Sequence, residues 1–178
     1  MADSHGGFAI GSEMSGGVED VRATNCNFIG SGRGFHIKSC RGRGGYVRNI
    51  YVEGFSMSRV TNSAISVDLS YQTKYGDGSE NIQADETTPV ISDIFVKNVF
   101  SQASDSPISI CGLPEMPVKN YVIENATLDA SRPGSARYVE GLVLRGVRID
   151  APGCAEFDSS KGDSDAMTFE YASGLVLE

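Results

Sequence analysis

One pattern of apolar and polar positions, eleven residues long, recurs along the chain. It has apolar residues at positions 1, 4, 6, 9 and 11, an Asn, Asp or Gly at position 3, and an Asn or Gly at position 8. Complete copies cover 18–28, 47–57, 91–101, 118–128 and 139–149, and a last, incomplete copy covers 172–177. Ser101 is the one residue that breaks the apolar rule at position 11. The chain is therefore built from one repeated unit.

The spacing within this unit predicts two short strands joined at a sharp bend. Positions 4 and 6 have the two-residue period of a strand with one buried face, and positions 9 and 11 resume that period after a break. Asn or Gly at position 8 can adopt the left-handed conformation that the bend requires. A single unit cannot bury its apolar face alone, so the units must stack on one another.

We therefore predict an all-β protein, a single-stranded parallel β-helix of five to six coils. Equivalent residues should lie in columns along the stack, and asparagines at equivalent corners should hydrogen-bond to one another. The column at position 4 is Val21, Ile50, Ile94, Tyr121 and Leu142. Asn125 is expected at an inward corner, which disfavours N-glycosylation of the Asn125-Ala126-Thr127 sequence.

The spacing between units separates this fold from its main alternative. Successive units start 29, 44, 27, 21 and 33 residues apart, which predicts loops of varied length on one side of the stack, including a long polar loop at about 71–86. A leucine-rich repeat shares apolar positions 1, 4, 6 and 11, but it has its asparagine at position 9 and steadier spacing. The β-helix is the better interpretation.

Length and composition predict one domain and no bound metal. The 178 residues can form a single core, so we expect one domain over 1–178. The four cysteines lie far apart with no CxxC pair, which argues against a metal cluster and favours buried thiols over disulfides. No apolar run is long enough to span a bilayer, and residues 1–7 lack the basic start and apolar core of a signal peptide. The cysteines are Cys26, Cys40, Cys111 and Cys154.

The charge is unevenly distributed. The chain has a net charge of −8, yet the segment from Val21 to Val52 contains no Asp or Glu and six cations. A basic block in an acidic protein can hold an anion. RNA binding through the Arg-Gly-Arg-Gly-Gly run at 41–45 is disfavoured by the net charge and by the lack of stacking aromatics. The six cations are Arg22, Arg33, Lys38, Arg41, Arg43 and Arg48.

A short strand within this block is the first candidate for chemistry. In Phe35-His36-Ile37-Lys38 the alternation sends Phe35 and Ile37 into the core and leaves His36 and Lys38 side by side outside. Two neighbouring donors on a rigid strand suit a carboxylate or a phosphate.

Two runs in the first quarter of the chain resemble a known family. The runs SHGGFAIGSEMSGGVEDVRATNCNF (4–28) and GRGFHIKSCRGRGG (32–45) are similar to the later part of polygalacturonases, glycoside hydrolase family 28. The resemblance covers the C-terminal part of that family only. It implies a right-handed parallel β-helix, an extracellular or periplasmic location, and inverting hydrolysis of pectin or polygalacturonate without a cofactor.

The resemblance also implies roles for individual residues. His5 matches the His-Gly histidine that supports the catalytic carboxylates, and Phe35–Lys38 matches the Arg-Ile-Lys motif that holds the galacturonate carboxylate. His36 stands where the family has arginine, so binding should be weaker, or stronger only below about pH 6.5. Lys38 keeps the second charge. Arg33 and Tyr71 are the further candidates for substrate binding.

The catalytic acid and base of the family have no counterpart here. Inversion needs two carboxyl groups roughly 6.5–9.5 Å apart, and the family places them upstream of His-Gly, where this chain has only four residues. We therefore expect a fragment whose N-terminal coils are missing and whose last coil is incomplete, able to bind substrate but inactive alone. The carboxylates that match no catalytic motif are Asp3, Glu13, Asp20, Asp68, Asp163 and Asp165.

Two further expectations follow. A non-catalytic β-helix that binds an anionic polysaccharide is the alternative function, since His36 replaces the arginine. A truncated stack would also expose an apolar cross-section and unpaired sheet edges at its ends, which favours self-association.

Overall fold

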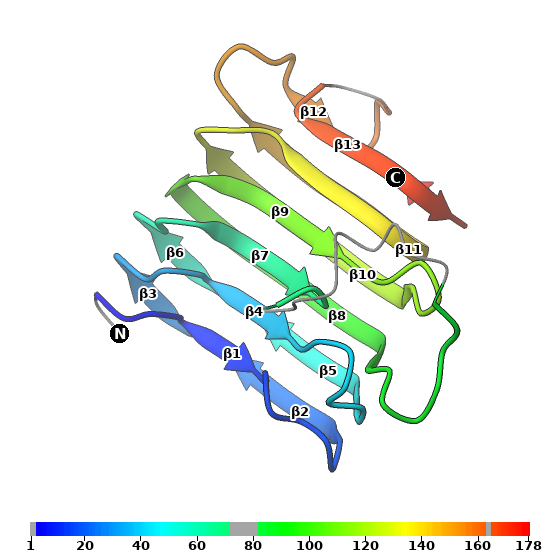
Figure 1. Ribbon diagram of the computed structural model, residues 1–178. Coiled ribbons are helices and arrows are strands. Elements are labelled where there is room, and N and C mark those ends of the chain that lie inside the picture. The colour runs from blue at the N-terminus through cyan, green and yellow to red at the C-terminus, as the bar shows by residue number, and fades with distance from the viewer. Residues whose placement is uncertain (1–2, 72–81, 163–164) are drawn as a thin grey trace.

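The protein forms a stack of β-coils, shown by a computed structural model that describes residues 3–71, 82–162 and 165–178 (Figure 1). Each turn of the chain runs along a front sheet, crosses to a rear sheet and continues into a short side strand before it starts the next coil. The chain advances along the stack in a right-handed sense (Figure 1). The all-β class, the parallel β-helix and the number of coils predicted from the sequence are confirmed.

Three sets of parallel strands build the stack. The front sheet contains β1 (Phe8–Ile10), β4 (Phe35–Lys38), β7 (Ser63–Asp68), β9 (Ser106–Cys111), the start of β11 (Gly134–Asp150) and β13 (Met167–Ser173). The rear sheet contains β2 (Val18–Thr24), β5 (Tyr46–Glu53), the first parts of β8 (Val90–Ser104) and β10 (Val118–Ala130), the middle of β11, and β14 (Val176–Leu177). The side strands are β3 (Asn27–Ile29), β6 (Ser56–Ser58) and the ends of β8, β10 and β11, with β12 (Phe157–Asp158) antiparallel to the last of these.

Each coil thus contains three strands, whereas the eleven-residue pattern predicted two. The repeated unit covers the rear strand and the side strand. Apart from Phe35–Lys38, which was predicted as a strand, the front strands lie in stretches that were assigned to loops. Loops of varied length do occur between the front and rear strands, as at 39–45 and 112–117, and the connection from β11 to β13 is long and contains β12. Residues 72–81 of the predicted polar loop lie outside the described residues.

The predicted column of apolar residues is present. Val21 pairs with Ile50, Ile50 with Ile94, Ile94 with Tyr121, and Tyr121 with Leu142. The last four are completely buried, and Val21 at the end of the column is half-buried against the same core. A continuous apolar core therefore runs through the stack.

The bends within the unit are made by residues in the left-handed conformation, and there are two columns of them. Position 8 was predicted to bend, and position 3 does so as well, with φ between 51° and 73° at both. The side-chain amide of Asn125 donates to Oδ1 of Asn98 at 3.3 Å, and that of Asn49 donates to Oδ1 of Asp20 at 3.1 Å. These ladders confirm the predicted bonds between corners. Asn125 is nevertheless exposed, so its predicted inward position is wrong.

The four cysteines are free thiols, as favoured from the sequence, but only Cys40 is buried and the others are half-buried. Across the described ranges, no helix is long and apolar enough to cross a membrane.

Candidate functional site

The candidate site lies on the front sheet, around strand β4 in the second coil. Phe35 and Ile37 are completely buried in the core, as the alternation predicted. Lys38 is half-buried on the outer side of the strand. His36 also lies on the outer side, but its exposure is only 3%, so the predicted exposed imidazole is wrong. Alternation decides the side of the sheet, while the neighbouring residues decide whether that side is covered.

Two residues from the next coil account for the burial of His36. Its Nδ1 lies 2.7 Å from the hydroxyl oxygen of Ser66, which occupies the equivalent position of β7. The ring of Tyr71 packs edge-on against the imidazole, with 6.5 Å between ring centroids. Nε2 is buried and has no hydrogen-bond partner among the residues that the structure describes.

This environment keeps His36 neutral. Burial, together with the nearby cations Arg33 and Lys38, lowers the pKa of His36 from 6.5 to about 4. The expectation that the imidazole gains charge just below pH 6.5 is therefore wrong. At neutral pH His36 offers a hydrogen-bonding ring and no charge. An anion would therefore have to be bound by the cationic neighbours Arg33 and Lys38.

Lys38 and Tyr71 come together although they are far apart in sequence. The Lys38 ammonium nitrogen lies 4.7 Å from the centroid of the Tyr71 ring, a cation–π contact. Tyr71 is placed by the backbone, because its N–H donates to the Ser39 carbonyl at 3.3 Å. A cation beside an aromatic ring is suited to a sugar acid, since the ring packs on the sugar and the cation pairs with its carboxylate.

The segment that carries His5 packs closely on the loop that carries Arg33. The N–H of Gly32 donates to the Ser4 carbonyl at 2.8 Å, and a Cβ at Gly32 would lie 2.3 Å from the His5 carbonyl oxygen. This close approach requires glycine at position 32. His5 is exposed and Arg33 is half-buried, and both are near enough to His36 to lower its pKa. The five candidate residues thus gather over the first three coils of the front sheet.

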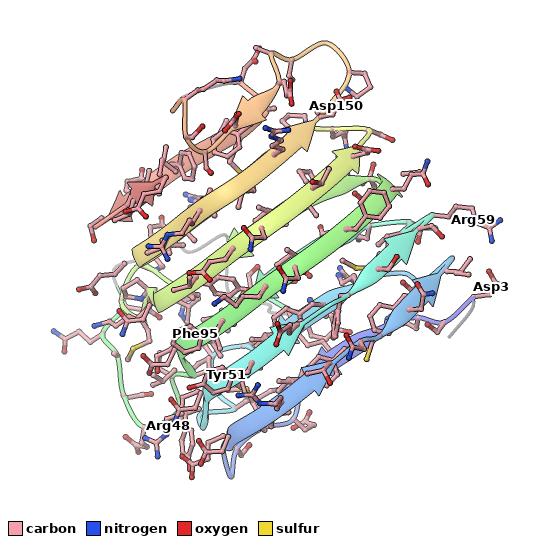
Figure 2. All side chains as sticks on the ribbon, turned by 180° about the vertical axis from the view of Figure 1, so that it is seen from behind. Asp3, Arg48, Tyr51, Arg59, Phe95 and Asp150 are labelled. Carbon is pink, nitrogen blue, oxygen red and sulfur yellow. The ribbon has the colours of Figure 1, made fainter. Side chains whose placement is uncertain are left out.

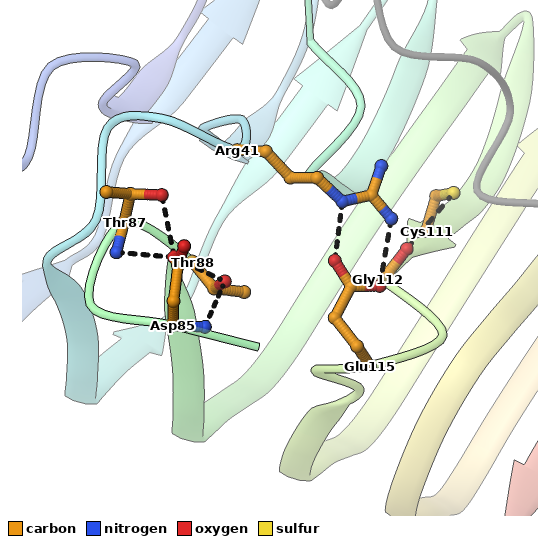
Figure 3. Close-up of polar contacts among 7 residues, drawn as sticks. All are labelled: Arg41, Asp85, Thr87, Thr88, Cys111, Gly112 and Glu115. Atoms are coloured by element: carbon orange, nitrogen blue, oxygen red, sulfur yellow. Dashed lines mark hydrogen bonds and ion pairs between the residues drawn. The ribbon is translucent and has the colours of Figure 1, made fainter. Parts of the chain in front are cut away.

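Most cations of the basic block are already engaged elsewhere. Arg41 makes a two-pronged ion pair with Glu115, at 2.5 and 2.8 Å, which links the loops after β4 and β9 (Figure 3). Arg43 pairs with Glu13 at 3.0 Å. On the rear sheet Arg48 pairs with Glu19, and Arg22 lies over the ring of Tyr51. Figure 2 labels Arg48 and Tyr51 on this sheet.

Among the described residues, two cations of the block remain without a carboxylate on the front side of the stack, while Arg22 on the rear sheet has only the ring of Tyr51. Within the described part of the chain, neither Arg33 nor Lys38 makes an ion pair, and these two flank His36. The basic block therefore resolves into structural ion pairs and one small cationic surface. The surface consists of the half-buried Arg33 and Lys38 beside the neutral His36.

The sequence interpretation missed two residues of this region. Ser66 is the partner of His36, and Asp68 occupies the position next to Lys38 on the neighbouring strand. The signal was available in the alternation of Ile65-Ser66-Val67-Asp68, which repeats that of Phe35–Lys38. It was overlooked because the front strands were not recognised as part of the repeat.

The carboxylates considered as catalytic candidates are dispersed. Asp20 belongs to a corner ladder, and Oδ1 of Asp165 accepts the Ala155 N–H at 2.8 Å in the last coil. Asp163 lies outside the described residues. In the part of the chain that the structure describes, no group of three or more His, Cys, Asp or Glu side chains is placed to hold a metal ion.

Fold and site together define a class, a right-handed parallel β-helix with a cationic and aromatic surface on one sheet. The sequence profile of glycosyl hydrolases family 28 matches residues 2–142. A probable polygalacturonase of Vitis vinifera is 32% identical over 139 residues, which cover 75% of this chain and 27% of the relative. A probable polygalacturonase of Arabidopsis thaliana is 28% identical over 164 residues, which cover 86% of this chain and 35% of that protein.

A solved structure agrees with these relatives. The hyperthermoactive exopolygalacturonase from Thermotoga maritima superposes with a TM-score of 0.66 and 27% identity, over 86% of this chain and 32% of that one. Since the family profile matches well over half of the chain, the protein belongs to glycosyl hydrolases family 28. The chain spans about a third of the length of these relatives.

Proposed function

We propose that this chain supplies part of the substrate-binding surface of a polygalacturonase-like hydrolase that cleaves pectin or polygalacturonate with inversion. The observation that carries the proposal is the cationic surface on the front sheet. Arg33 and Lys38 lack carboxylate partners within the described residues, and Lys38 lies on the ring of Tyr71. The membership of family 28 supports a galacturonate as the anion.

The roles of the residues differ from one another. Lys38 pairs with the substrate carboxylate and Tyr71 packs on the sugar ring, while Arg33 adds positive potential. His36, neutral and bonded to Ser66, positions Tyr71 and Lys38 instead of pairing with the anion. His5, exposed at the edge of the first coil, is the residue that approaches the cleaved bond. Pectin is an extracellular polymer, so we place the function outside the cell.

Binding of polygalacturonate tests this proposal. We expect weak binding that falls as salt is added and that Lys38→Ala lowers roughly tenfold, because a charge pair is lost. Lys119→Ala is the matched control, since Lys119 is a lysine on the rear sheet that already pairs with Glu140. Equal loss in both variants, or binding that salt does not affect, would refute a specific role for Lys38.

Hydrolysis is expected to need residues beyond this chain. An inverting mechanism uses an acid and a base on opposite sides of the scissile bond, whereas Asp20 belongs to a corner ladder and Asp165 to the last coil. The chain by itself should release no reducing ends from polygalacturonate. Release that His5→Ala abolishes would show that this chain contains its own acid and base.

A further inference from the structure

A row of small hydroxyl side chains runs along the front sheet from the candidate site. The position of His36 is occupied by serine or threonine in each later coil, because the register pairs His36 with Ser66, Ser66 with Ser109, Ser109 with Ser135, and Ser135 with Thr168. A shallow cleft of about 300 Å³ lies farther along the stack, over the third to fifth coils, and includes Ser109 and Ser135 of this row. Its lining includes Asn62, Ser63, Ser106, Ser109, Arg132 and Ser135.

This row gives a bound saccharide a direction. It crosses the strands, so it follows the axis of the stack, and successive rungs are about 4.8 Å apart. One pyranose ring covers a similar length in an extended polysaccharide. Serine hydroxyls donate and accept hydrogen bonds, as sugar hydroxyls do. A chain held at Lys38 therefore continues over the next coils and not across the sheet edge.

The position two residues after the serine row also forms a column along the sheet, and its members in the second and third coils carry opposite charges. Lys38 pairs in register with Asp68, and Asp68 pairs with Cys111. Although Lys38 and Asp68 are neighbours of opposite charge, no ion pair joins them. Lys38 lies on Tyr71, whereas Oδ1 of Asp68 accepts the N–H and the hydroxyl of Ser70, at 3.0 and 2.9 Å. Asp68 is half-buried and thus presents a negative charge one rung beyond the cation that holds the substrate.

We infer that Asp68 selects an uncharged sugar unit, such as a methyl-esterified galacturonate, next to the free galacturonate held by Lys38. This inference rests on the proposed function and names the substrate class of the same surface. A second free carboxylate directly over Asp68 would meet a like charge, whereas a methyl ester would not. The preferred ligand is then partly esterified pectin, and fully de-esterified polygalacturonate is disfavoured.

Calorimetric titration of the 178-residue chain with two galacturonate oligomers of equal length tests this inference. One oligomer is fully de-esterified and the other carries methyl esters on about half of its units. The wild-type protein should bind the partly esterified oligomer more tightly. Asp68→Asn should raise the affinity for the de-esterified oligomer roughly tenfold and so remove the preference. Asn keeps the acceptor oxygen for Ser70, and circular dichroism checks that the variant folds.

Two further variants separate charge from structure. Asp68→Glu keeps the negative charge and should keep the preference. Asp150→Asn makes the same charge change at an exposed position at the end of β11, away from the front sheet (Figure 2), and should leave both affinities unchanged. Binding that does not depend on esterification, or that Asp68→Asn leaves unaltered, overturns this inference alone. Absence of binding to both oligomers overturns the proposed function, and the inference with it.

Discussion

Nδ1 of His36 lies 2.7 Å from the hydroxyl oxygen of Ser66 on the neighbouring strand. The contact joins the second and third coils directly beneath the candidate site. It forms because the two residues occupy equivalent positions in register, and the small serine leaves room for the imidazole. The proposed sugar surface therefore has a buried neutral histidine under it.

The stability of the protein should depend on pH through His36. Its pKa is about 4 in the folded protein and near 6.5 when unfolded, so the unfolded chain binds the extra proton between these values. The neutral His36 therefore contributes fully to the free energy of unfolding above pH 6.5. This contribution falls as the pH is lowered toward 4, by at most about 3 kcal/mol. Denaturant unfolding at pH 7 and pH 4.5 measures this loss, and His36→Gln should show a smaller one. An equal loss in both proteins would mean that His36 already titrates normally in the fold.

The ion pair between Arg41 and Glu115 should be a strong structural link. Both side chains are nearly buried, with exposures of 9% and 6% (Figure 3). Glu115→Gln leaves the guanidinium without its counter-charge and should lower the free energy of unfolding by about 3 kcal/mol. Replacing both residues, Arg41→Met with Glu115→Leu, should recover most of that loss. The exposed pair of Lys119 and Glu140 is the control, for which we expect a change of about 0–1 kcal/mol. A similarly small effect of Glu115→Gln would contradict the prediction.

Two core positions should gain stability when a hydroxyl is removed. Tyr121 and Ser101 are completely buried, and within the described residues neither hydroxyl oxygen has a hydrogen-bond partner. Burial of the phenol without a partner also raises the pKa of Tyr121. Tyr121→Phe and Ser101→Ala should each raise the free energy of unfolding by about 1 kcal/mol. Tyr51→Phe, at a surface tyrosine, should change it little. A lower melting temperature in both core variants would indicate partners for these hydroxyls.

The first coil should promote self-association. Its inward-facing side chains Phe8, Val18 and Val21 are only half-buried against the core, so apolar surface stays in contact with water. We expect light scattering to show oligomers whose fraction rises with protein concentration. Val18→Lys, which charges this surface, should reduce the association. A monomer that persists at high concentration would exclude an interface at this coil.

The rear half of every coil follows from the sequence alone. The column of Ile50, Ile94 and Tyr121 and the bends at Asn98 and Asn125 could be predicted, because a two-residue period and a left-handed corner are local properties of the chain. The same alternation placed Phe35 and Ile37 in the core.

The tertiary structure alone decided what surrounds each outward-facing residue. The burial of His36 depends on Ser66 and Tyr71, some thirty residues later in the chain, and the freedom of Lys38 depends on which cations Glu13, Glu19 and Glu115 reach. Those partners arrive through loops of unequal length, so no fixed spacing in the sequence marks them. The front strands other than Phe35–Lys38 were not predicted for the same reason, because the distance from each of them to the next repeated unit varies from coil to coil.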